Sequence, residues 1–401
     1  MAELLAIYLR PGPEFLDTVR RAWDRGDAVL VVPQEAPQQF RIDLALGLGA
    51  GTWVDASGTH STEGGWPVEP GDALVVATSG TTGEPKGVVH THQSIEASAF
   101  STATALGVGP THWLCCLPLS HVAGMSVITR SWLTGAELTV HDGFDAAAVD
   151  RTATAGATHV SLVPTALRRI DTTLWQRILL GGSSIPADRP ANTVAGYGMT
   201  ETYGGIVYEG QALPGVSVRI AGASGNTGES GPIEVRTPTA MSGYRRRPRS
   251  GDEAILDPSA IDSSGWLRTG DLGRIHPIDG RLQVEGRADD LINTGGEKVW
   301  PTPVEQLLET HPGVSEAAVI GVPDAEWGRR VKAVIVPAEG AAPPTLQAMR
   351  DWVSASLPKA AAPREVELVS QLPRTSLGKL RRSSLYHTGG DGDSGGGERG
   401  N

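Results

Sequence analysis

The stretch A-T-S-G-T-T-G-E-P-K-G occupies residues 77–87 and follows the apolar run A-L-V-V-A, which predicts a buried strand. Its glycines permit a tight turn that exposes backbone N–H groups, and such groups cradle phosphate. The hydroxyls add hydrogen bonds and Lys86 adds a positive charge. The stretch is not a Walker A loop, because Pro85 precedes the lysine. A polar hairpin is the alternative interpretation. However, Lys86 is the only lysine among the 21 basic residues of positions 1–286, which favours phosphate binding.

The composition indicates a globular protein with more than one domain. The chain has 401 residues, of which 39% are hydrophobic and 20% are charged. Its formal charge of −11 argues against nucleic acid or an anionic membrane as a partner. Residues 1–286 hold 21 basic and 30 acidic residues, a net of −9, whereas residues 287–387 hold 12 of each. The less acidic C-terminal part is better suited to receive an anionic ligand.

The cytoplasm is the expected location. Cys115 and Cys116 are adjacent in an apolar setting, which predicts buried thiols in a reducing compartment. The first apolar stretch is too short for a signal peptide, and no apolar run approaches the ~20 residues of a membrane span.

The hydrophobic pattern predicts an α/β fold. Apolar runs that each end in a polar or glycine-rich loop are typical of a buried parallel sheet. We expect a helix over residues 13–25, a loop over 47–71, and a helix whose first residues are 88–100. Strands are expected over 28–33, 113–119, 138–141, 160–163, 178–180 and 194–197.

The pattern changes along the second half of the chain. Shorter alternating segments after about Leu213 predict antiparallel strands or a small β-barrel. From Arg287 the pattern predicts a small α+β domain with helices over 301–311 and 345–357. Residues 388–401 are of low complexity and are expected to be disordered. The predicted domains are therefore residues 1–286 and 287–387, followed by this tail.

Several further motifs carry chemistry. The sequence G-Y-G-M-T-E of residues 196–201 combines glycines, an aromatic ring, a hydroxyl and a carboxylate. A carboxylate beside nucleotide phosphates would repel them unless a cation lies between, so Glu201 is interpreted as a Mg²⁺ ligand, with a solvated loop acid as the alternative. Asp271 follows a glycine turn and can accept hydrogen bonds from the two hydroxyls of a ribose. The other motifs are P-L-S-H at 118–121, G-R-A-D-D-L-I at 286–292 and P-R-T-S-L-G-K at 373–379.

In their order and spacing these motifs resemble the acyl-adenylate-forming superfamily of acyl-CoA synthetases, adenylation domains and luciferases. The resemblance implies a large N-terminal domain of layered α/β subdomains with a small β-barrel-like subdomain, and a small mobile α+β C-terminal domain. It implies that ATP and AMP bind to Thr78, Ser79, Gly80, Thr81, Thr82, Gly83, Lys86, Gly181, Gly182, Ser183, Gly196, Tyr197, Gly198, Thr200, Asp271 and Arg287.

The resemblance also implies individual roles. Thr200 would contact the α-phosphate, Glu201 would hold Mg²⁺, and Lys379 would enter the site for adenylation. The small domain would rotate about Asp289, and coenzyme A would pass Gly295 and Gly296. His121 would lie beside the acyl pocket, for which an ordinary structural histidine is the alternative.

The implied reaction joins a small carboxylic acid to coenzyme A through an acyl-AMP intermediate, with ATP and Mg²⁺. The short front and the sequence M-T-E-T-Y-G-G-I-V-Y-E-G most resemble o-succinylbenzoate–CoA ligases of menaquinone biosynthesis. Another aryl or medium-chain acid–CoA ligase, an adenylation protein that loads a carrier protein, and a non-catalytic nucleotide-binding protein are the alternatives. The second carboxylate of o-succinylbenzoate needs a partner, for which Arg130, Arg168 and Ser183 are candidates. Whether the chain forms a homodimer stays open, because its front is shorter than in relatives.

Overall fold

The structure is a computed structural model. It describes residues 2–61, 64–79, 85–107, 111–182, 185–186, 188–223, 228–246, 256–374 and 380–386. The tail predicted to be disordered lies outside these residues. Contacts divide the chain into two compact units, Met1–Thr269 with Gly273–Gln283 and Gly270–Leu272 with Val284–Asn401. No helix within the described part of the chain is long and apolar enough to cross a lipid bilayer.

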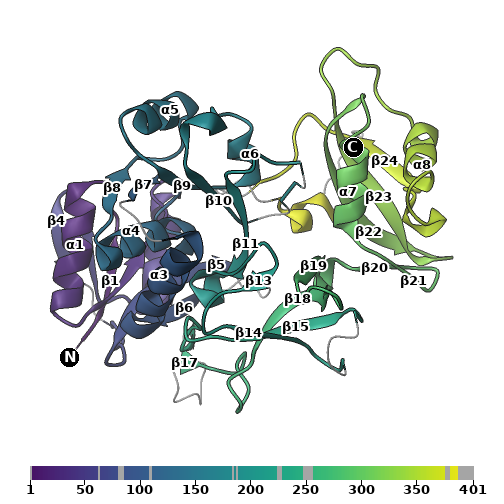
Figure 1. Ribbon diagram of the computed structural model, residues 1–401. Coiled ribbons are helices and arrows are strands. Elements are labelled where there is room, and N and C mark those ends of the chain that lie inside the picture. Colours follow the sequence, from purple (N-terminus) through teal and green to yellow (C-terminus); the bar gives the residue numbers. More distant parts are fainter. Residues whose placement is uncertain are drawn as a thin grey trace, which may run out of the picture. The chain divides into compact units, whose positions relative to one another are not determined.

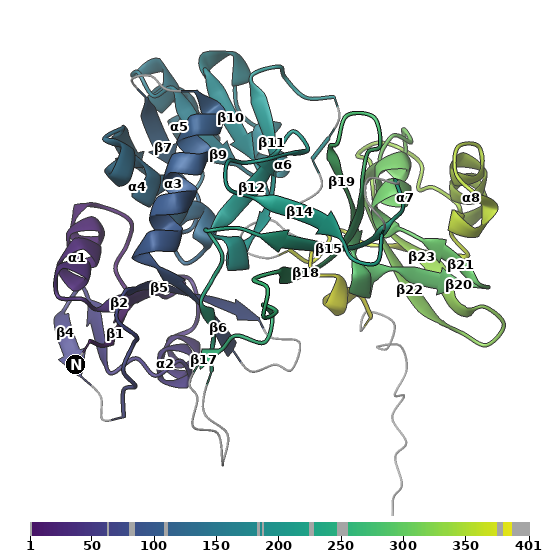
Figure 2. The same ribbon diagram turned by 60° about the horizontal axis from the view of Figure 1, so that its bottom comes forward.

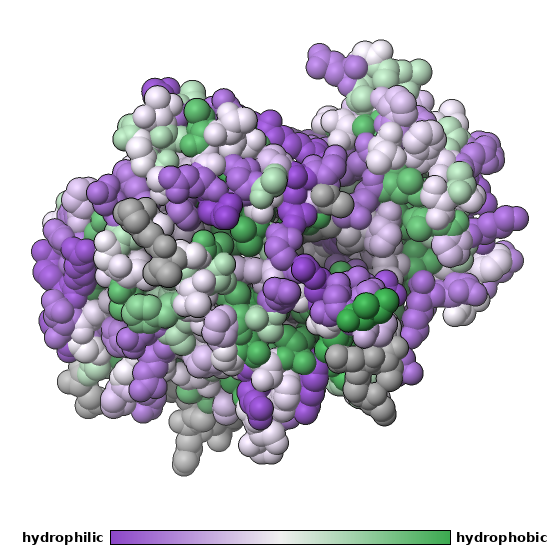
Figure 3. Space-filling model, in the orientation of Figure 1, coloured by the Kyte–Doolittle hydropathy of each residue, from purple (hydrophilic) through white to green (hydrophobic). Residues whose placement is uncertain are grey.

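The first unit begins with a sheet of eight described strands in the order β17-β16-β6-β5-β2-β1-β3-β4. Their bounds are β1 Leu4–Ile7, β2 Ala28–Val31, β3 Thr52–Asp55, β4 Gly58–Ser61, β5 Asp72–Ser79, β6 Pro85–Thr91, β16 Gly243–Arg245 and β17 Leu256–Asp257. Helix α1 (Pro13–Asp24) matches the predicted helix and buries Phe15, Val19 and Ala22. Hydrophilic side chains cover the outer surface over α1, at the left edge of Figure 3. Helix α2 spans Gln38–Gly47.

Two predictions for this region are wrong. Residues 47–71 are not a continuous loop, because β3 and β4 form an antiparallel hairpin. These strands are four residues long and largely polar, so their hydrophobic alternation is too weak to reveal them. The helix predicted to start at Val88 starts at His92, because Val88 and Val89 belong to β6. Thr91 caps that helix, α3 (His92–Leu106), by accepting a hydrogen bond from the N–H of Ser94.

The second sheet of the first unit has seven described strands in the order β13-β12-β11-β10-β9-β7-β8. Their bounds are β7 His112–Cys115, β8 Glu137–Val140, β9 His159–Leu162, β10 Arg177–Leu180, β11 Thr193–Met199, β12 Gly204–Tyr208 and β13 Gln211–Ala212. The run from β8 to β11 is parallel, as predicted, and β11 pairs antiparallel with β12. The strand expected over 113–119 is shorter and ends at Cys115; Cys116, Leu117 and Leu119 are buried without strand pairing.

Helices cover this sheet. Helices α3 and α4 (Val122–Thr134) pack against each other, and both also contact strand β12 (Figure 1). Helix α5 spans Ala146–Thr154 and the short helix α6 spans Pro164–Leu167. The side chains of Trp113, Cys115, Met125 and Ile128 fill the core between α4 and the sheet, and both cysteines are buried free thiols.

A four-stranded sheet, ordered β14-β15-β18-β19, occupies the part of the chain for which antiparallel strands are predicted. Its strands are β14 Ser217–Ile220, β15 Gly231–Arg236, β18 Leu267–Ile275 and β19 Leu282–Arg287. Both β18 and β19 contribute residues to each of the two units, so the chain passes between the units within these strands.

The second unit contains a mixed sheet in the order β21-β20-β23-β22, with β24 beside β23. Its strands are β20 Ile292–Thr294, β21 Glu297–Val299, β22 Val314–Asp324, β23 Gly328–Pro337 and β24 Glu365–Leu368. Helices α7 (Pro301–Leu308) and α8 (Leu346–Ser354) lie on the same side of this sheet (Figures 1 and 2). They share one core with it, including Leu308, Val319, Ala333 and Met349. This is the predicted α+β arrangement.

Candidate active site

The hairpin of β5 and β6 positions Lys86. Thr78 pairs with Lys86 across the two strands, and the Thr78 hydroxyl donates to the Lys86 carbonyl at 3.4 Å. The residues that join the strands, Gly80, Thr81, Thr82, Gly83 and Glu84, lie outside the described residues, as does the side chain of Ser79. The predicted phosphate loop therefore connects two adjacent strands of a sheet, and Lys86 stands just after it.

A tyrosine links Lys86 to the second motif. Strand β16 pairs with β6, which brings Tyr244 opposite Val88. The Lys86 Nζ lies 5.1 Å from the centre of the Tyr244 ring, within the range of a cation–π contact. The Tyr244 hydroxyl donates to Glu201 Oε1 at 2.8 Å. Two motifs that are more than a hundred residues apart in sequence therefore share one aromatic side chain. The sequence predicted no role for Tyr244, because only the pairing of β16 with β6 places it there.

The turn that carries Thr200 and Glu201 is fixed from several sides. The backbone N–H of Met241 donates to the Glu201 carbonyl at 2.9 Å. His90, which is fully buried on β6, donates from Nε2 to the Thr200 carbonyl at 2.7 Å. Burial lowers the pKa of His90 to about 4, so the ring is neutral. Sequence reasoning missed His90, since it was expected within the beginning of a helix.

The glycines of the second motif permit a close strand pairing. Gly196 pairs with Tyr208, and Gly198 with Gly205. A Cβ atom at Gly198 would lie 1.9 Å from the Gly204 carbonyl oxygen, which no side chain can accommodate. Tyr197 lies between these glycines and is partly buried. The pairing places Thr200 and Glu201 where β11 turns into β12.

The segment of Gly181 and Gly182, also predicted to bind the nucleotide, lies beside strand β11. Gly181 follows β10, the parallel neighbour of β11, and its N–H donates to the Leu162 carbonyl. A Cβ at Gly181 would meet only the Gly196 carbonyl oxygen, at 3.9 Å. Gly182 has a φ of 87°, which favours glycine. Ser183 lies outside the described residues. Gly181 thus lies beside Gly196.

His121 stands at the beginning of helix α4. Its backbone N–H donates to the Pro118 carbonyl at 3.2 Å, and burial lowers the pKa of its imidazole. A Cβ at Gly124 would lie 2.5 Å from the Pro118 oxygen, so the first turn of α4 packs directly on the chain before His121. Further along α4, the hydroxyl of Ser126 lies 3.9 Å from the Cβ position of Gly204. The helix therefore borders the β11–β12 turn.

Arg130 is a buried cation on the same helix. The residue is 4% exposed, and its guanidinium lies 4.4 Å from the centre of the Trp113 ring. Its Nε and Nη1 atoms find no hydrogen-bond acceptor in the described part of the chain. Burial lowers the pKa of Arg130, and the nearby Tyr208 and Tyr203 phenols oppose that shift. An unpaired buried charge is costly, so this cation is suited to receive an anionic group.

The other candidate partners for a second carboxylate fit less well. Arg168 is exposed just after α6, and Ser183 lies outside the described residues. Among the three candidates, only Arg130 combines burial with open donor atoms.

The remaining predicted residues belong to the second unit. Asp271 is 8% exposed and pairs with Arg287, whose Nη1 lies 3.5 Å from Asp271 Oδ1. Asp289 is exposed on a single turn of 3₁₀-helix, Ala288–Asp290. Gly295 and Gly296 form the turn between β20 and β21, with φ values of 58° and 86°. Lys379 lies outside the described residues.

Glu201 meets the basic requirement for a Mg²⁺ ligand. Its carboxylate stands next to the phosphate hairpin and accepts one hydrogen bond, from Tyr244, through Oε1. Within the described residues, no group of three or more His, Cys, Asp or Glu side chains could hold a metal ion by itself. One carboxylate with oxygens supplied by substrate phosphates and water is the usual way in which proteins hold Mg²⁺.

Comparisons with known proteins identify the family of the chain. Residues 31–245 match the AMP-binding enzyme family, and residues 303–379 match the AMP-binding enzyme C-terminal domain. The protein of Mycobacterium tuberculosis named probable 2-succinylbenzoate–CoA ligase is 40% identical over 338 residues, which cover 78% of this chain and 83% of that protein. A feruloyl-CoA synthase of an Amycolatopsis species is 33% identical over 346 residues, covering 78% and 69%.

The chain is also similar to solved structures. The o-succinylbenzoate CoA synthetase of Bacillus subtilis, in complex with the acyl-adenylate intermediate OSB-AMP, aligns with a TM-score of 0.82 and 28% identity over 96% of this chain and 88% of that one. The same enzyme in complex with ATP and magnesium ion aligns with a TM-score of 0.80, at 28% identity over 96% and 89%. The match to the family covers more than half of the chain, in the part where Lys86, Tyr244 and Glu201 meet. This chain therefore belongs to the AMP-binding enzyme family.

Proposed function

We propose that this protein is an ATP-dependent carboxylate–CoA ligase that converts o-succinylbenzoate into its coenzyme A thioester through an acyl-AMP intermediate. The observation that carries the proposal is the link from Lys86 through Tyr244 to Glu201, which joins the phosphate hairpin to the Thr-Glu turn. The names of the relatives from M. tuberculosis and B. subtilis support the acid. The buried thiols of Cys115 and Cys116 support a cytoplasmic location.

In the first half-reaction, an oxygen of the substrate carboxylate attacks the α-phosphorus of ATP, and the bond to pyrophosphate breaks. Both reactants are anions, so the protein mainly neutralises charge and aligns the two groups. Lys86 and Lys379 would supply positive charge, and Thr200 would donate to the α-phosphate. Glu201 would hold Mg²⁺, which neutralises phosphate charge when bound.

In the second half-reaction, the thiol of coenzyme A loses its proton, attacks the acyl carbonyl carbon and releases AMP. We propose that the C-terminal domain turns about Asp289, withdraws Lys379 and brings Gly295 and Gly296 beside the pantetheine arm. The cluster of Arg329, Arg330 and Lys332 is a weaker candidate for the phosphates of coenzyme A. Two of these cations are already paired, Arg330 with Asp324 and Glu365, and Lys332 with Glu365 and Glu367.

Arg130 is the proposed partner of the second carboxylate. Its guanidinium is buried, and its Nε and Nη1 find no acceptor among the described residues, so each can donate a hydrogen bond to a carboxylate oxygen. We expect Arg130→Lys to weaken use of o-succinylbenzoate more than that of a matched acid without the second carboxylate. Benzoylpropionate is such an acid. Equal weakening for both acids would contradict this role.

Two measurements test the proposed function. ATP–pyrophosphate exchange over a panel of acids identifies the acid that is activated. The panel includes o-succinylbenzoate and ferulate, because the similarity to a feruloyl-CoA synthase of Amycolatopsis makes an aryl acid the alternative substrate. Thioester formation with coenzyme A, compared with loading of a carrier protein, identifies the acceptor. If only ferulate supports exchange, ferulate takes the place of o-succinylbenzoate as the proposed substrate. The absence of exchange with every acid would favour a non-catalytic nucleotide-binding protein.

A further inference from the structure

Arg245 is a buried cation on strand β16, directly after Tyr244. The residue is 4% exposed, and its guanidinium donates to three backbone carbonyls, each at 2.8 Å: Nε to Leu48, Nη1 to Pro67 and Nη2 to Trp66. Burial lowers the pKa of Arg245 to about 10, so the side chain is charged at neutral pH. Main-chain oxygens that lie 178 to 197 residues earlier in the sequence therefore hold this charge.

The three carbonyls are themselves brought together by local contacts. The backbone N–H of Trp66 donates to the Gly49 carbonyl at 3.0 Å. A Cβ atom at Gly49 would lie 2.3 Å from the Trp66 ring, so the ring packs directly on this glycine, whose φ is 74°. The guanidinium of Arg245 lies 5.6 Å from the centre of the same ring. The carbonyls of Leu48, Trp66 and Pro67 thus form one binding site for the guanidinium, which we call the Arg245 anchor.

Tyr244 and Arg245 point to opposite faces of the sheet, because successive side chains of a strand alternate. On one face, the Tyr244 ring contacts Lys86 and its hydroxyl donates to Glu201. On the other face, Arg245 pairs with Gly87, where a Cβ atom would meet the leucine side chain of the Arg245 anchor at 3.3 Å. The contacts of the proposed active site and the anchor are therefore one residue apart on the same strand.

Strand β16 is short, so strand pairing alone fixes its register weakly. It has three residues, Gly243–Arg245, and two residue pairs join it to β17 in the described part of the chain. A shift of one residue along β6 would turn Tyr244 to the other face of the sheet. The hydrogen bonds of Arg245 oppose such a shift, because the guanidinium would have to leave all three carbonyls.

We propose that Arg245 is a positioning residue that holds Tyr244 against Lys86 and Glu201 and thereby shapes the site proposed for ATP and Mg²⁺. Arg245 lies on the other face of the sheet from these groups and acts through Tyr244. Without the Arg245 anchor, β16 would tilt or shift, and the Tyr244 hydroxyl would lose the carboxylate of Glu201. This inference rests on the proposed ligase function, and specifically on the binding of ATP with Mg²⁺.

The test is a double-mutant cycle of Arg245→Lys and Tyr244→Phe. Lysine keeps the charge, but a single ammonium group cannot reach all three carbonyls as the guanidinium fork does. Isothermal titration calorimetry measures the dissociation constant of ATP with and without Mg²⁺, and the ratio of the two constants is the gain from Mg²⁺. Arg245→Lys is expected to lower this gain about tenfold, as would the loss of the hydrogen bond from Tyr244 to a charged group. In Tyr244→Phe that bond is already absent, so adding Arg245→Lys should change the gain by less than about twofold.

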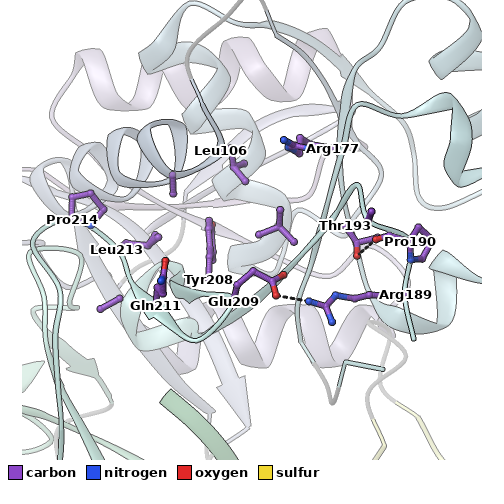
Figure 4. Close-up of a pocket in the computed structure, with 14 residues that line it drawn as sticks. Leu106, Arg177, Arg189, Pro190, Thr193, Tyr208, Glu209, Gln211, Leu213 and Pro214 are labelled. Atoms are coloured by element: carbon purple, nitrogen blue, oxygen red, sulfur yellow. Dashed lines mark hydrogen bonds and ion pairs between the residues drawn. The ribbon is translucent and has the colours of Figure 1, made fainter. Parts of the chain in front are cut away.

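The control is Arg189→Lys, which makes the same exchange at the ends of β11 and β12 opposite the Thr-Glu turn. Arg189 pairs with Glu209 at 2.5 Å beside a groove of about 650 Å³, as the dashed line in Figure 4 marks. This variant should leave the gain from Mg²⁺ within about twofold of that of the parent protein. Denaturant unfolding of each variant shows whether it is folded under the conditions of the titration.

A second variant reaches the same contact from the other side. Trp66→Leu keeps Arg245 and removes the ring that packs on Gly49, so it weakens the Arg245 anchor even if Arg245→Lys does not fold. It should also lower the gain from Mg²⁺ in the parent protein but not in Tyr244→Phe. The proposal is overturned if neither variant lowers the gain, if either lowers it equally in Tyr244→Phe, or if the Arg189→Lys control lowers it as much.

Failure of the proposed function gives a different result. ATP binding needs no acid, so a protein that activates another acid would show the same pattern in the cycle, whereas exchange with o-succinylbenzoate tests that acid separately. A parent protein with no gain from Mg²⁺ would overturn the role proposed for Glu201, and the positioning role of Arg245 with it.

Discussion

At the scale of single residues, the Tyr244 hydroxyl joins Glu201 to the hairpin that carries Lys86. Tyr244→Phe removes this donor and leaves the ring under the lysine. A hydrogen bond to a charged group contributes about 1.5–3 kcal/mol, so we expect kcat/KM for ATP–pyrophosphate exchange to fall about tenfold or more. Tyr8→Phe is the matched control, because Tyr8 donates to the Arg41 carbonyl, remote in sequence from the motifs. Unchanged exchange in Tyr244→Phe would contradict the role of the hydroxyl.

The burial of His90 predicts how the stability of the protein depends on pH. Its pKa is about 4 in the folded chain, against 6.5 for an ordinary histidine, because burial disfavours the charged ring. The folded state therefore binds the proton less readily than the unfolded state, and stability present above pH 6.5 is lost as the pH falls toward 4. From pH 7 to pH 5 this contribution amounts to about 2 kcal/mol.

The test of His90 is the variant His90→Gln, which can keep a donor to the Thr200 carbonyl but has no titrating ring. Denaturant unfolding at the two pH values should show a smaller loss of stability on acidification in the variant than in the parent protein. If the free energy of unfolding falls equally on acidification in the parent protein and in His90→Gln, His90 is not the source of the pH dependence.

At the scale of elements, Arg382 ties together three parts of the C-terminal unit. Its guanidinium pairs with Glu305 on α7, donates to the Val319 carbonyl on β22 and reaches Asp290 Oδ2 at 3.2 Å. Asp290 follows the proposed pivot Asp289. Because Asp290 is bound into this unit, rotation between the half-reactions is expected to occur at or before Asp289.

This network should matter for stability. Arg382→Met leaves Glu305, which is 12% exposed, without its cation, and removing one partner of a buried pair costs about 3 kcal/mol or more. Arg374→Met breaks the more exposed pair with Glu316 and should cost less than about 1 kcal/mol. Amide hydrogen exchange of α7 reports the loss of stability in each variant. Equal loss of protection in the two variants would show that the Arg382 network stabilises the unit no more than the exposed pair of Arg374 and Glu316 does.

At the scale of the whole molecule, the proposed alternation predicts a separation of the two half-reactions. Lys379→Ala should reduce acyl-AMP formation about 100-fold, the usual effect of removing one stabilising contact to a transition state. It should still convert supplied acyl-AMP and coenzyme A into thioester. Lys359→Ala, which changes another lysine of the same unit, should leave both steps intact. Equal loss of both half-reactions in Lys379→Ala would refute the alternating role.

The sequence predicted the features that depend on local pattern. The apolar runs of β9, β10 and β11 and the amphipathic helix α1 could be identified because burial gives each its period. The short polar hairpin of β3 and β4 lacked such a period. Tyr244 and His90 could not be assigned to the site, because strand pairing between distant segments places them there. Arg130 was one candidate among three until its burial and open donors were known.

The isolation of Lys86 has a practical consequence. Since it is the only lysine before residue 287, a reagent that acylates primary amines can modify the first 286 residues at one side chain besides the chain's own amino terminus. Its Nζ rests on the Tyr244 ring, next to the proposed phosphate site. The extent of labelling at this one amine, followed by peptide mass with and without nucleotide, would therefore report occupancy of the site directly.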